Sequence, residues 1–244
     1  MPSADPDSDS DVEFEDVLSQ PNQSQGQNHN NTSQSPWIPT LSLPDQRDHP
    51  ATPGSEEENQ LRGRLTAGLD RINYRQMKAE MGIDTDTDLP PSERRYENFQ
   101  ELAHDINTLI DMLWVSATPS IQTEALLTLA GLLEKSLKTY PFTPYPTLGI
   151  LHKFDSVFVA LCTGRHPLTN VEIPGAHDQR QVVTQTQKVR IRSLAETTRN
   201  TIFGMLPDDE EEEQPWLEDV ARVYDGVLML LEGEGGRAWF DLER

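Results

Sequence analysis

Hydrophobic residues recur at intervals of three and four along most of the chain between residues 55 and 233. The strongest repeat runs from Phe99 to Trp114, where apolar residues return at this spacing for about four turns. Such spacing places them on one face of an α-helix. No segment shows a sustained alternation of apolar and polar residues, which a half-buried strand would require. The pattern therefore predicts an all-α protein.

The first predicted helix covers residues 55–82. Ser55 lies three residues before Glu58, which is the spacing of a capping box, and acids in a first turn suit the helix dipole. Gly63 and Gly68 each lower the intrinsic stability of this helix by up to about 1 kcal/mol relative to alanine. We therefore expect it to be peripheral.

Prolines and capping residues divide the rest of the chain. Thr118 and Pro119 supply an N-cap and a first helical residue. The proline-rich connector over residues 141–146 cannot be helical throughout, so Thr147 is predicted to cap the following helix, which Gly164 ends. The predicted main helices cover residues 99–114, 120–139, 147–164, 181–206 and 215–233.

These elements predict a bundle of about five main helices plus the peripheral one. We place the bundle domain at residues 92–233, with a linker over residues 83–91. Residues 1–54 form a predicted acidic and polar tail, and residues 234–244 form a second tail.

The acidity of the chain is concentrated at its two ends. The 244 residues include 41 acidic and 20 basic side chains, for a net charge of −21. Residues 1–91 carry a net charge of −11 and residues 207–244 carry −10, whereas residues 92–206 are neutral. Because residues 1–54 are rich in Asp, Glu, Ser, Gln, Asn and Pro, they cannot bury enough apolar surface to offset the ordering entropy, and we predict that they are disordered.

The sequence lacks the common catalytic motifs. It has no phosphate-binding loop, dinucleotide fingerprint, zinc-protease helix or nucleophile elbow. The one cysteine, Cys162, excludes an intrachain disulfide and is expected to act as a small buried hydrophobe. His104 and Asp105 are interpreted as a surface pair, since no second histidine-rich cluster completes a metal site. We predict a protein that is not an enzyme and has no cofactor; an unrecognised enzyme would need a polar pocket with coupled histidine and carboxylate groups.

One short segment concentrates positive charge. Lys188, Arg190, Arg192 and Arg199 lie on a predicted helix, where they could contact a phosphate or an acidic partner. The alternative is a solvated face that screens the acidic tails. Direct DNA association through this helix, inhibited by those tails, is the second functional hypothesis, although the net acidity of the chain disfavours it.

The N-terminal tail contains two groups of apolar residues among acidic and polar ones. Such compositions are typical of segments that fold onto a partner, and the alternative is a solubilising tail. The candidate docking residues are Val12, Phe14, Val17, Leu18, Trp37 and Ile38. Four residues of the tail have acid-directed or proline-directed phosphorylation contexts: Ser8, Ser10, Ser35 and Thr52.

A further charged segment, residues 208–213, consists of six consecutive acids between two predicted helices. It is interpreted either as a solvated loop or as a contact for a basic partner.

Two segments resemble a known group of proteins. Residues 148–164, LGILHKFDSVFVALCTG, and residues 186–199, TQKVRIRSLAETTR, resemble a little-characterised group of filamentous-fungal helical proteins, some labelled as meiotic recombination proteins. The resemblance spans about residues 95–232. Recombinases themselves are ATPases with a phosphate loop and an α/β core, and neither is present here. The resemblance therefore implies an accessory factor in meiotic recombination or chromatin processes.

The leading hypothesis is a non-enzymatic interaction or adaptor protein whose helical domain binds a protein partner. The N-terminal residues lack a signal-peptide pattern, and no apolar run approaches the roughly 18 residues of a membrane span. We therefore predict an intracellular protein without membrane contact, in the nucleus or cytoplasm, with the nucleus favoured by the resemblance.

Overall fold

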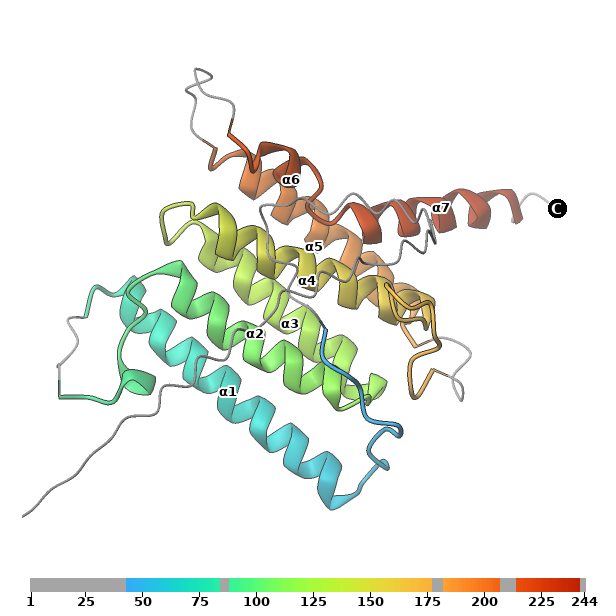
Figure 1. Cartoon of the computed structure of the whole chain (residues 1–244), viewed down its shortest axis with the longest axis horizontal. Coiled ribbons are helices and arrows are strands. Elements are labelled where there is room, and N and C mark those ends of the chain that lie inside the picture. The colour runs from blue at the N-terminus through green and yellow to red at the C-terminus, as the bar shows by residue number, and fades with distance from the viewer. Residues whose placement is uncertain (1–42, 84–87, 177–181, 207–213, 242–244) are drawn as a thin grey trace, which may run out of the picture. The chain divides into compact units, whose positions relative to one another are not determined.

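The computed structural model describes residues 43–83, 88–176, 182–206 and 214–241 (Figure 1). These parts are helical and contain no named strand; an isolated antiparallel bridge joins Arg165 to Glu172. The all-α prediction is confirmed. The helices are α1 (Glu56–Glu80), the 3-10 helix η1 (Pro91–Glu93), α2 (Phe99–Val115), α3 (Pro119–Leu137), α4 (Pro144–Thr163), α5 (Gln185–Phe203), α6 (Leu217–Ala221) and α7 (Asp225–Asp241).

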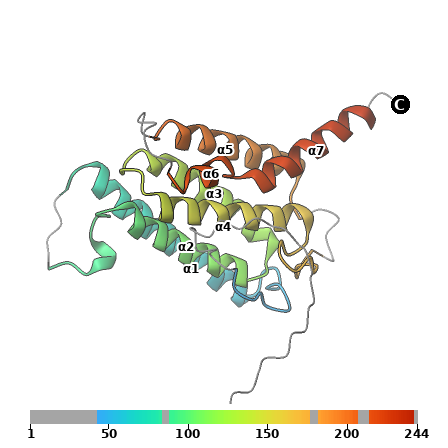
Figure 2. The same ribbon diagram turned by 45° about the horizontal axis from the view of Figure 1, so that its top comes forward.

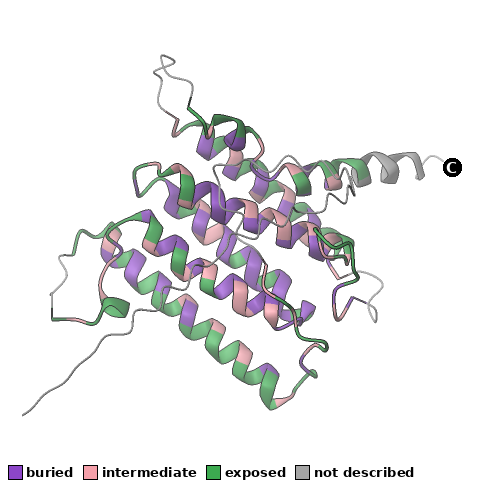
Figure 3. Cartoon of the chain, in the orientation of Figure 1, coloured by how far each residue is buried: buried purple, intermediate pink, exposed green. Residues whose placement is uncertain are grey.

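The core of the bundle forms around α3, which contacts α1, α2, α4 and α5. Its buried positions lie on several sides of the helix, as its leucine content predicts. In Figure 3 the buried faces of α2, α3 and α4 turn toward one another. All eight apolar residues that mark the predicted stripe of α2 are buried. The largest fully buried side chains include Trp114, Phe154, Phe158, Leu102, Ile106, Ile110, Leu113, Leu126, Leu129 and Leu133.

Helix α1 packs against α2 through Gly68. A Cβ atom added to Gly68 would lie 2.5 Å from Leu109 Cδ2, whereas one added to Gly63 would have no atom within 4 Å. Gly68 therefore allows the close approach of α1 and α2, and its cost in helix propensity is offset by packing. Ile72 from the same helix is fully buried in the core.

A polar network also joins α1 to α2. The guanidinium of Arg75 donates to Asp105 at 2.9 Å, to Glu101 at 2.8 Å and to the carbonyl of Arg94 at 2.8 Å. It lies 3.9 Å from the ring centroid of Tyr96, whose hydroxyl donates to Asp105 at 2.8 Å. Burial and this carboxylate raise the pKa of Tyr96 well above its usual range, so the phenol remains a donor. Helix α1 thus contributes both apolar and charged contacts to the bundle.

The capping box of α1 differs from the predicted one in a single contact, the backbone N–H that binds the carboxylate of Glu58. The hydroxyl of Ser55 accepts from the N–H of Glu58 at 3.1 Å, as expected. The carboxylate of Glu58 accepts from the N–H of Gly54 at 2.6 Å, because the N–H of Ser55 already donates to the carbonyl of Thr52.

Residues 43–51 form an extended strap on the bundle, so the prediction of disorder over residues 1–54 is wrong for this part. The indole of Trp114 donates to the carbonyl of Pro44 at 2.8 Å, and the N–H of Ala51 donates to the hydroxyl of Thr118 at 3.1 Å. Thr118 therefore holds the strap, and its side chain makes no capping bond to α3. Residues 1–42 lie outside the described residues.

Two predicted helix starts are corrected. Helix α4 begins at Pro144, three residues before the predicted cap Thr147, because the first turn of a helix needs no N–H donors and accepts prolines. Helix α5 begins at Gln185, after a capping box between Thr184 and Gln187. As predicted, Gly164 ends α4 in a left-handed conformation, at a φ of 71°.

The last predicted helix is divided into α6 and α7. The break lies at Tyr224, which is fully buried and has a φ of 58°. Asp155 of α4 binds the first turn of α7. Its carboxylate accepts from the N–H groups of Gly226 at 3.1 Å and Val227 at 2.8 Å. Helix α7 continues beyond the predicted end at Gly233, so residues 234–241 are helical (Figure 2).

Candidate interaction surfaces

The basic residues predicted on one helix do lie on α5, but they contact different neighbours. Arg190 pairs with Glu124 of α3 at 2.8 Å, and Arg192 pairs with Glu196 at 2.8 Å. Arg199 reaches Asp225 of α7 at 2.9 Å and the carbonyl of Ala221 at 2.8 Å. The three guanidinium groups are therefore bonded to acceptors within the chain.

Lys188 is separated from these arginines by burial. Its exposed fraction is 9%, and it lines a cavity with Cys162, Arg165 and Glu172. Contact of these four basic residues with a partner or a phosphate remains a prediction. The structure adds a requirement, since a partner must replace ion pairs that already exist. Exposed pairs of this kind contribute roughly 0–1 kcal/mol each, so replacement is energetically feasible.

Hydrogen bonds from α5 also change the pKa of Glu124 in α3. The side chains of Gln187 and Arg190 donate to Glu124, and these hydrogen bonds lower the pKa of its carboxyl. The ion pair between Arg190 and Glu124 therefore remains charged at neutral pH, and it links the first half of α5 to α3.

No described residues form a cluster of three or more His, Cys, Asp and Glu side chains able to hold a metal ion. His104 is exposed, and Asp105 belongs to the Arg75 network. Cys162 is half-buried on α4. The structure therefore gives Asp105 a structural role, in the contacts between α1 and α2.

His152 of α4 is a histidine with a shifted pKa, and Asp219 of α6 is close enough to affect it. Burial lowers the pKa of His152, while the charge of Asp219 opposes that shift. Nearby, burial raises the pKa of Asp155 to about 6, outweighing the two backbone donors that bind it. Neither residue lines any of the three described cavities. An enzyme with coupled histidine and carboxylate groups in a pocket is therefore not supported by the described residues.

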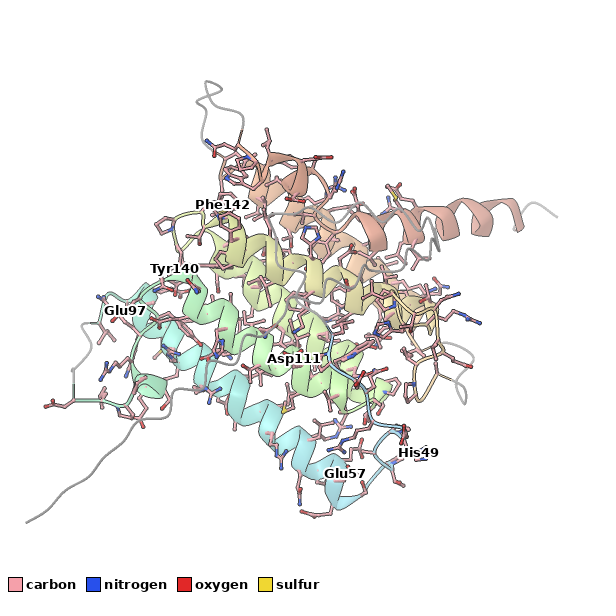
Figure 4. The ribbon with its side chains drawn as sticks, viewed as in Figure 1. His49, Glu57, Glu97, Asp111, Tyr140 and Phe142 are labelled. Carbon is pink, nitrogen blue, oxygen red and sulfur yellow. The ribbon has the colours of Figure 1, made fainter. Side chains whose placement is uncertain are left out.

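A cavity of about 470 Å³ lies between the strap, α1 and α2. Its lining mixes Leu61 and Met112 with Arg64 and Asp111, and the ion pair between Arg47 and Glu57 joins the strap to α1 beside it. Figure 4 shows Asp111 on α2 and Glu57 at the start of α1. The mixed lining indicates no specific ligand class.

Exposed apolar side chains form the surfaces that sequence analysis did not identify. One group lies at the end of α1, with Tyr74, Met77, Met81 and Ile83, and a loop exposes Leu168 and Val171. A third group combines the start of α4, the end of α5 and the start of α6, with Tyr145, Phe203 and Leu217. Helical spacing alone identifies buried stripes, and residues outside a stripe carry no comparable signal.

The docking candidates Val12, Phe14, Val17, Leu18, Trp37 and Ile38 lie outside the described residues, as do the phosphorylation candidates Ser8, Ser10 and Ser35. Thr52 is described. It is exposed in the turn before α1, where its carbonyl accepts from the N–H of Ser55 at 3.0 Å. None of the described helices combines the length and apolar character that a membrane span requires.

Comparison with known proteins corrects the resemblance noted in the sequence. A family model described as TFB6, subunit 11 of the general transcription factor TFIIH, matches residues 95–219. This match includes both segments that suggested meiotic recombination proteins, and it overturns that assignment. No curated protein and no solved structure matches the chain significantly. Because the family is that of a transcription factor subunit, it supports the prediction of a protein that is not an enzyme. The matched residues comprise α2 to α5 and the beginning of α6, just over half of the chain, and the chain belongs to the TFB6 family.

Proposed function

We propose that this protein assembles into the general transcription factor TFIIH as a non-enzymatic subunit and acts there through protein contacts. The observation that carries this proposal is the family match over residues 95–219, which covers the four helices around the buried core. The same assembly would place the protein in the nucleus. Its function would then depend on surfaces of the bundle, because the family is that of a transcription factor subunit.

A second contact is proposed for the N-terminal tail. Between Asp5 and Leu18 the sequence has seven acids and no base, interleaved with Val12, Phe14 and Val17. Such a segment suits a partner surface that combines basic side chains with an apolar pocket. The tail would extend the contact made by the bundle.

Co-purification tests the assembly. The full chain carrying a C-terminal affinity tag is expressed in the organism of origin, and TFIIH is isolated through one of its other subunits. We expect the tagged chain to elute with the complex at a constant ratio through size-exclusion chromatography. Elution apart from the complex, with a native circular dichroism spectrum, would refute the proposal.

The same purification measures the contribution of the tail. Phe14→Ala combined with Val17→Ala removes two apolar side chains without changing the charge. Ser24→Ala combined with Ser33→Ala in the same tail is the matched control. We expect the first variant, but not the second, to be lost at lower salt than the unmodified chain. Equal retention of both variants would remove the tail from the interface.

Direct DNA association is not proposed. The three arginines that could contact phosphates from α5 are bonded to Glu124, Glu196 and Asp225. No other observation on the described residues favours a nucleic-acid partner.

A further inference from the structure

One end of the bundle exposes apolar side chains from three helices. We call this the apolar end surface and define it as Phe142, Tyr145, Phe203, Trp216 and Leu217. Tyr145, Phe203 and Leu217 have exposed fractions of 46%, 47% and 50%. Phe142 and Trp216 are partly buried against the core. Large apolar groups that remain this exposed at neighbouring positions often mark a contact with another molecule.

Contacts between the elements bring these residues together. The rings of Phe142 and Trp216 meet edge to face, with centroids 5.3 Å apart. Leu217 follows Trp216 in the chain, Tyr145 lies three residues after Phe142, and α5 packs against α6. Figures 1 and 2 show the connector before α4, the end of α5 and α6 at the same end of the bundle, and Figure 4 places Phe142 on the side facing α6.

The backbone beneath this surface is well fixed. Tyr145 lies between Pro144 and Pro146 in the first turn of α4, where the prolines restrict the main chain. The N–H of Val220 donates to the carbonyl of Trp216 at 3.1 Å, which closes the first turn of α6. Aromatic side chains also lose little rotamer entropy when they are covered. A partner that binds here would therefore pay a small ordering cost.

The sequence beside the surface is strongly acidic. Residues 208–213 are six consecutive acids, and the chain that carries them is fixed at Leu206 on one side and Gln214 on the other. Glu218, next to Leu217, has a side chain that is 75% exposed and forms an ion pair with Arg222. The sequence that joins α5 to α6 is therefore acidic.

We propose that the apolar end surface binds a basic segment of a protein partner, one that inserts aliphatic or aromatic side chains between Tyr145, Phe203 and Leu217. The apolar groups supply the contact area, and the acidic sequence between α5 and α6 favours lysine- and arginine-rich partners. The inference rests on the proposed function in one respect: within TFIIH, the partner would be another subunit of the complex.

The first experiment tests the surface on the isolated full chain. The probe is a fluorescent twelve-residue peptide of alternating lysine and leucine pairs; control peptides replace lysine by glutamate or leucine by serine. Fluorescence anisotropy is expected to show binding of the first peptide alone. The triple variant Tyr145→Ser, Phe203→Ser, Leu217→Ser should weaken binding about tenfold or more.

Matched controls separate this surface from general hydrophobicity. Val189→Ser and Met229→Ser remove apolar side chains that are 68% and 69% exposed, on α5 and α7, and should leave binding unchanged. Replacing residues 208–213 by Asn and Gln should weaken binding and its dependence on salt. Circular dichroism melting checks that every variant is folded. The inference is overturned if the control variants weaken binding equally, or if the glutamate peptide binds as well as the lysine peptide.

The second experiment identifies the natural segment. A photo-crosslinking residue is introduced at Leu217, or at Met229 as a control, and the chain is assembled into TFIIH. We expect crosslinks from the first position to one partner segment of net positive charge. If the chain assembles but this position yields none, the inference fails while the proposed function stands. If the chain does not assemble yet the lysine peptide binds the surface, the proposed function fails and the surface chemistry stands.

Discussion

Replacing Arg75 by alanine should release α1 from the bundle. This arginine has a side chain that is only 9% exposed, and it binds Asp105, Glu101 and the carbonyl of Arg94. Removing it leaves Asp105, with a side chain 16% exposed, bonded only through Tyr96 among the contacts described here. The carbonyl of Arg94 also loses its buried donor. The substitution therefore breaks a network and leaves its other members in place.

The magnitude follows from the burial of each contact. Removing one partner of a buried ion pair costs about 3–5 kcal/mol, because the remaining charge stays desolvated. The pair with Glu101 adds little, since that carboxylate is 37% exposed. We expect a loss of about 3–4 kcal/mol in the free energy of unfolding. For a folded region of this size the corresponding fall in Tm is roughly 10 °C.

The assay combines thermal melting with amide hydrogen exchange. Arg71→Ala on the same helix is the control, because Arg71 is exposed and should change stability by less than about 0.5 kcal/mol. A double-mutant cycle with Asp105→Ala measures the coupling between the two charged partners. Exchange rates in α1 and α2 report whether α1 opens on its own or with the whole bundle.

Two results would refute this reasoning. Destabilisation of less than about 1 kcal/mol would show that the network contributes no more than a surface ion pair. A cycle without coupling between Arg75 and Asp105 would show that their contact has no energetic role. If α1 alone exchanges faster, the helix is an attached element, in agreement with the predicted peripheral helix over residues 55–82.

Three further predictions concern packing and protonation. Gly68→Ala should lower the free energy of unfolding by roughly 1 kcal/mol because its Cβ would displace the buried Leu109, whereas Gly63→Ala should raise it; equal increases, measured by thermal melting, would contradict the close approach of the helices. Asp155 has a folded-state pKa raised to about 6; the stability that it contributes is therefore present at about pH 4 and falls by up to about 1.4 kcal/mol per pH unit as the pH rises toward 6. Denaturant titrations should show this slope in the native chain relative to Asp155→Asn, and parallel profiles would count against it. Tyr224→Phe should leave Tm unchanged or raise it, because the buried hydroxyl of Tyr224 has no hydrogen-bond partner among the described residues; a fall of several degrees would reveal a partner.

Elements with a long local signal could be predicted from the sequence. The stripe of α2 is predicted in full because each of its eight apolar positions follows from the same 3.6-residue period. Gly164 at the end of α4 is equally local, since a left-handed φ is least costly for glycine. The start of α5 also had a local signal in Thr184 and Gln187, which form a capping box.

Other features depend on contacts between distant residues, and no local pattern encodes them. The break before α7 is stabilised by Asp155, 71 residues away from Gly226. The apolar periodicity runs through this break, so the sequence predicts one continuous helix. The composition of the strap predicts disorder, yet a carbonyl and an N–H of the strap bond to Trp114 and Thr118, which lie 70 and 67 residues further along the chain. A short polar segment can be ordered when a folded surface supplies its partners.

Contacts between distant residues also explain why the candidate site in the structure differs from the one that the sequence predicts. The sequence predicts a site where positive charge is dense, at Lys188, Arg190, Arg192 and Arg199. A charge count along the chain does not include partners such as Glu124, which lies 66 residues away from Arg190. Once the fold pairs those charges, the surfaces left without a partner are apolar ones such as that around Tyr145 and Leu217. An acidic chain that pairs the three arginines of α5 and exposes apolar groups on the elements flanking its acidic sequence is suited to basic, partly apolar protein segments. It is poorly suited to the uniform negative charge of DNA.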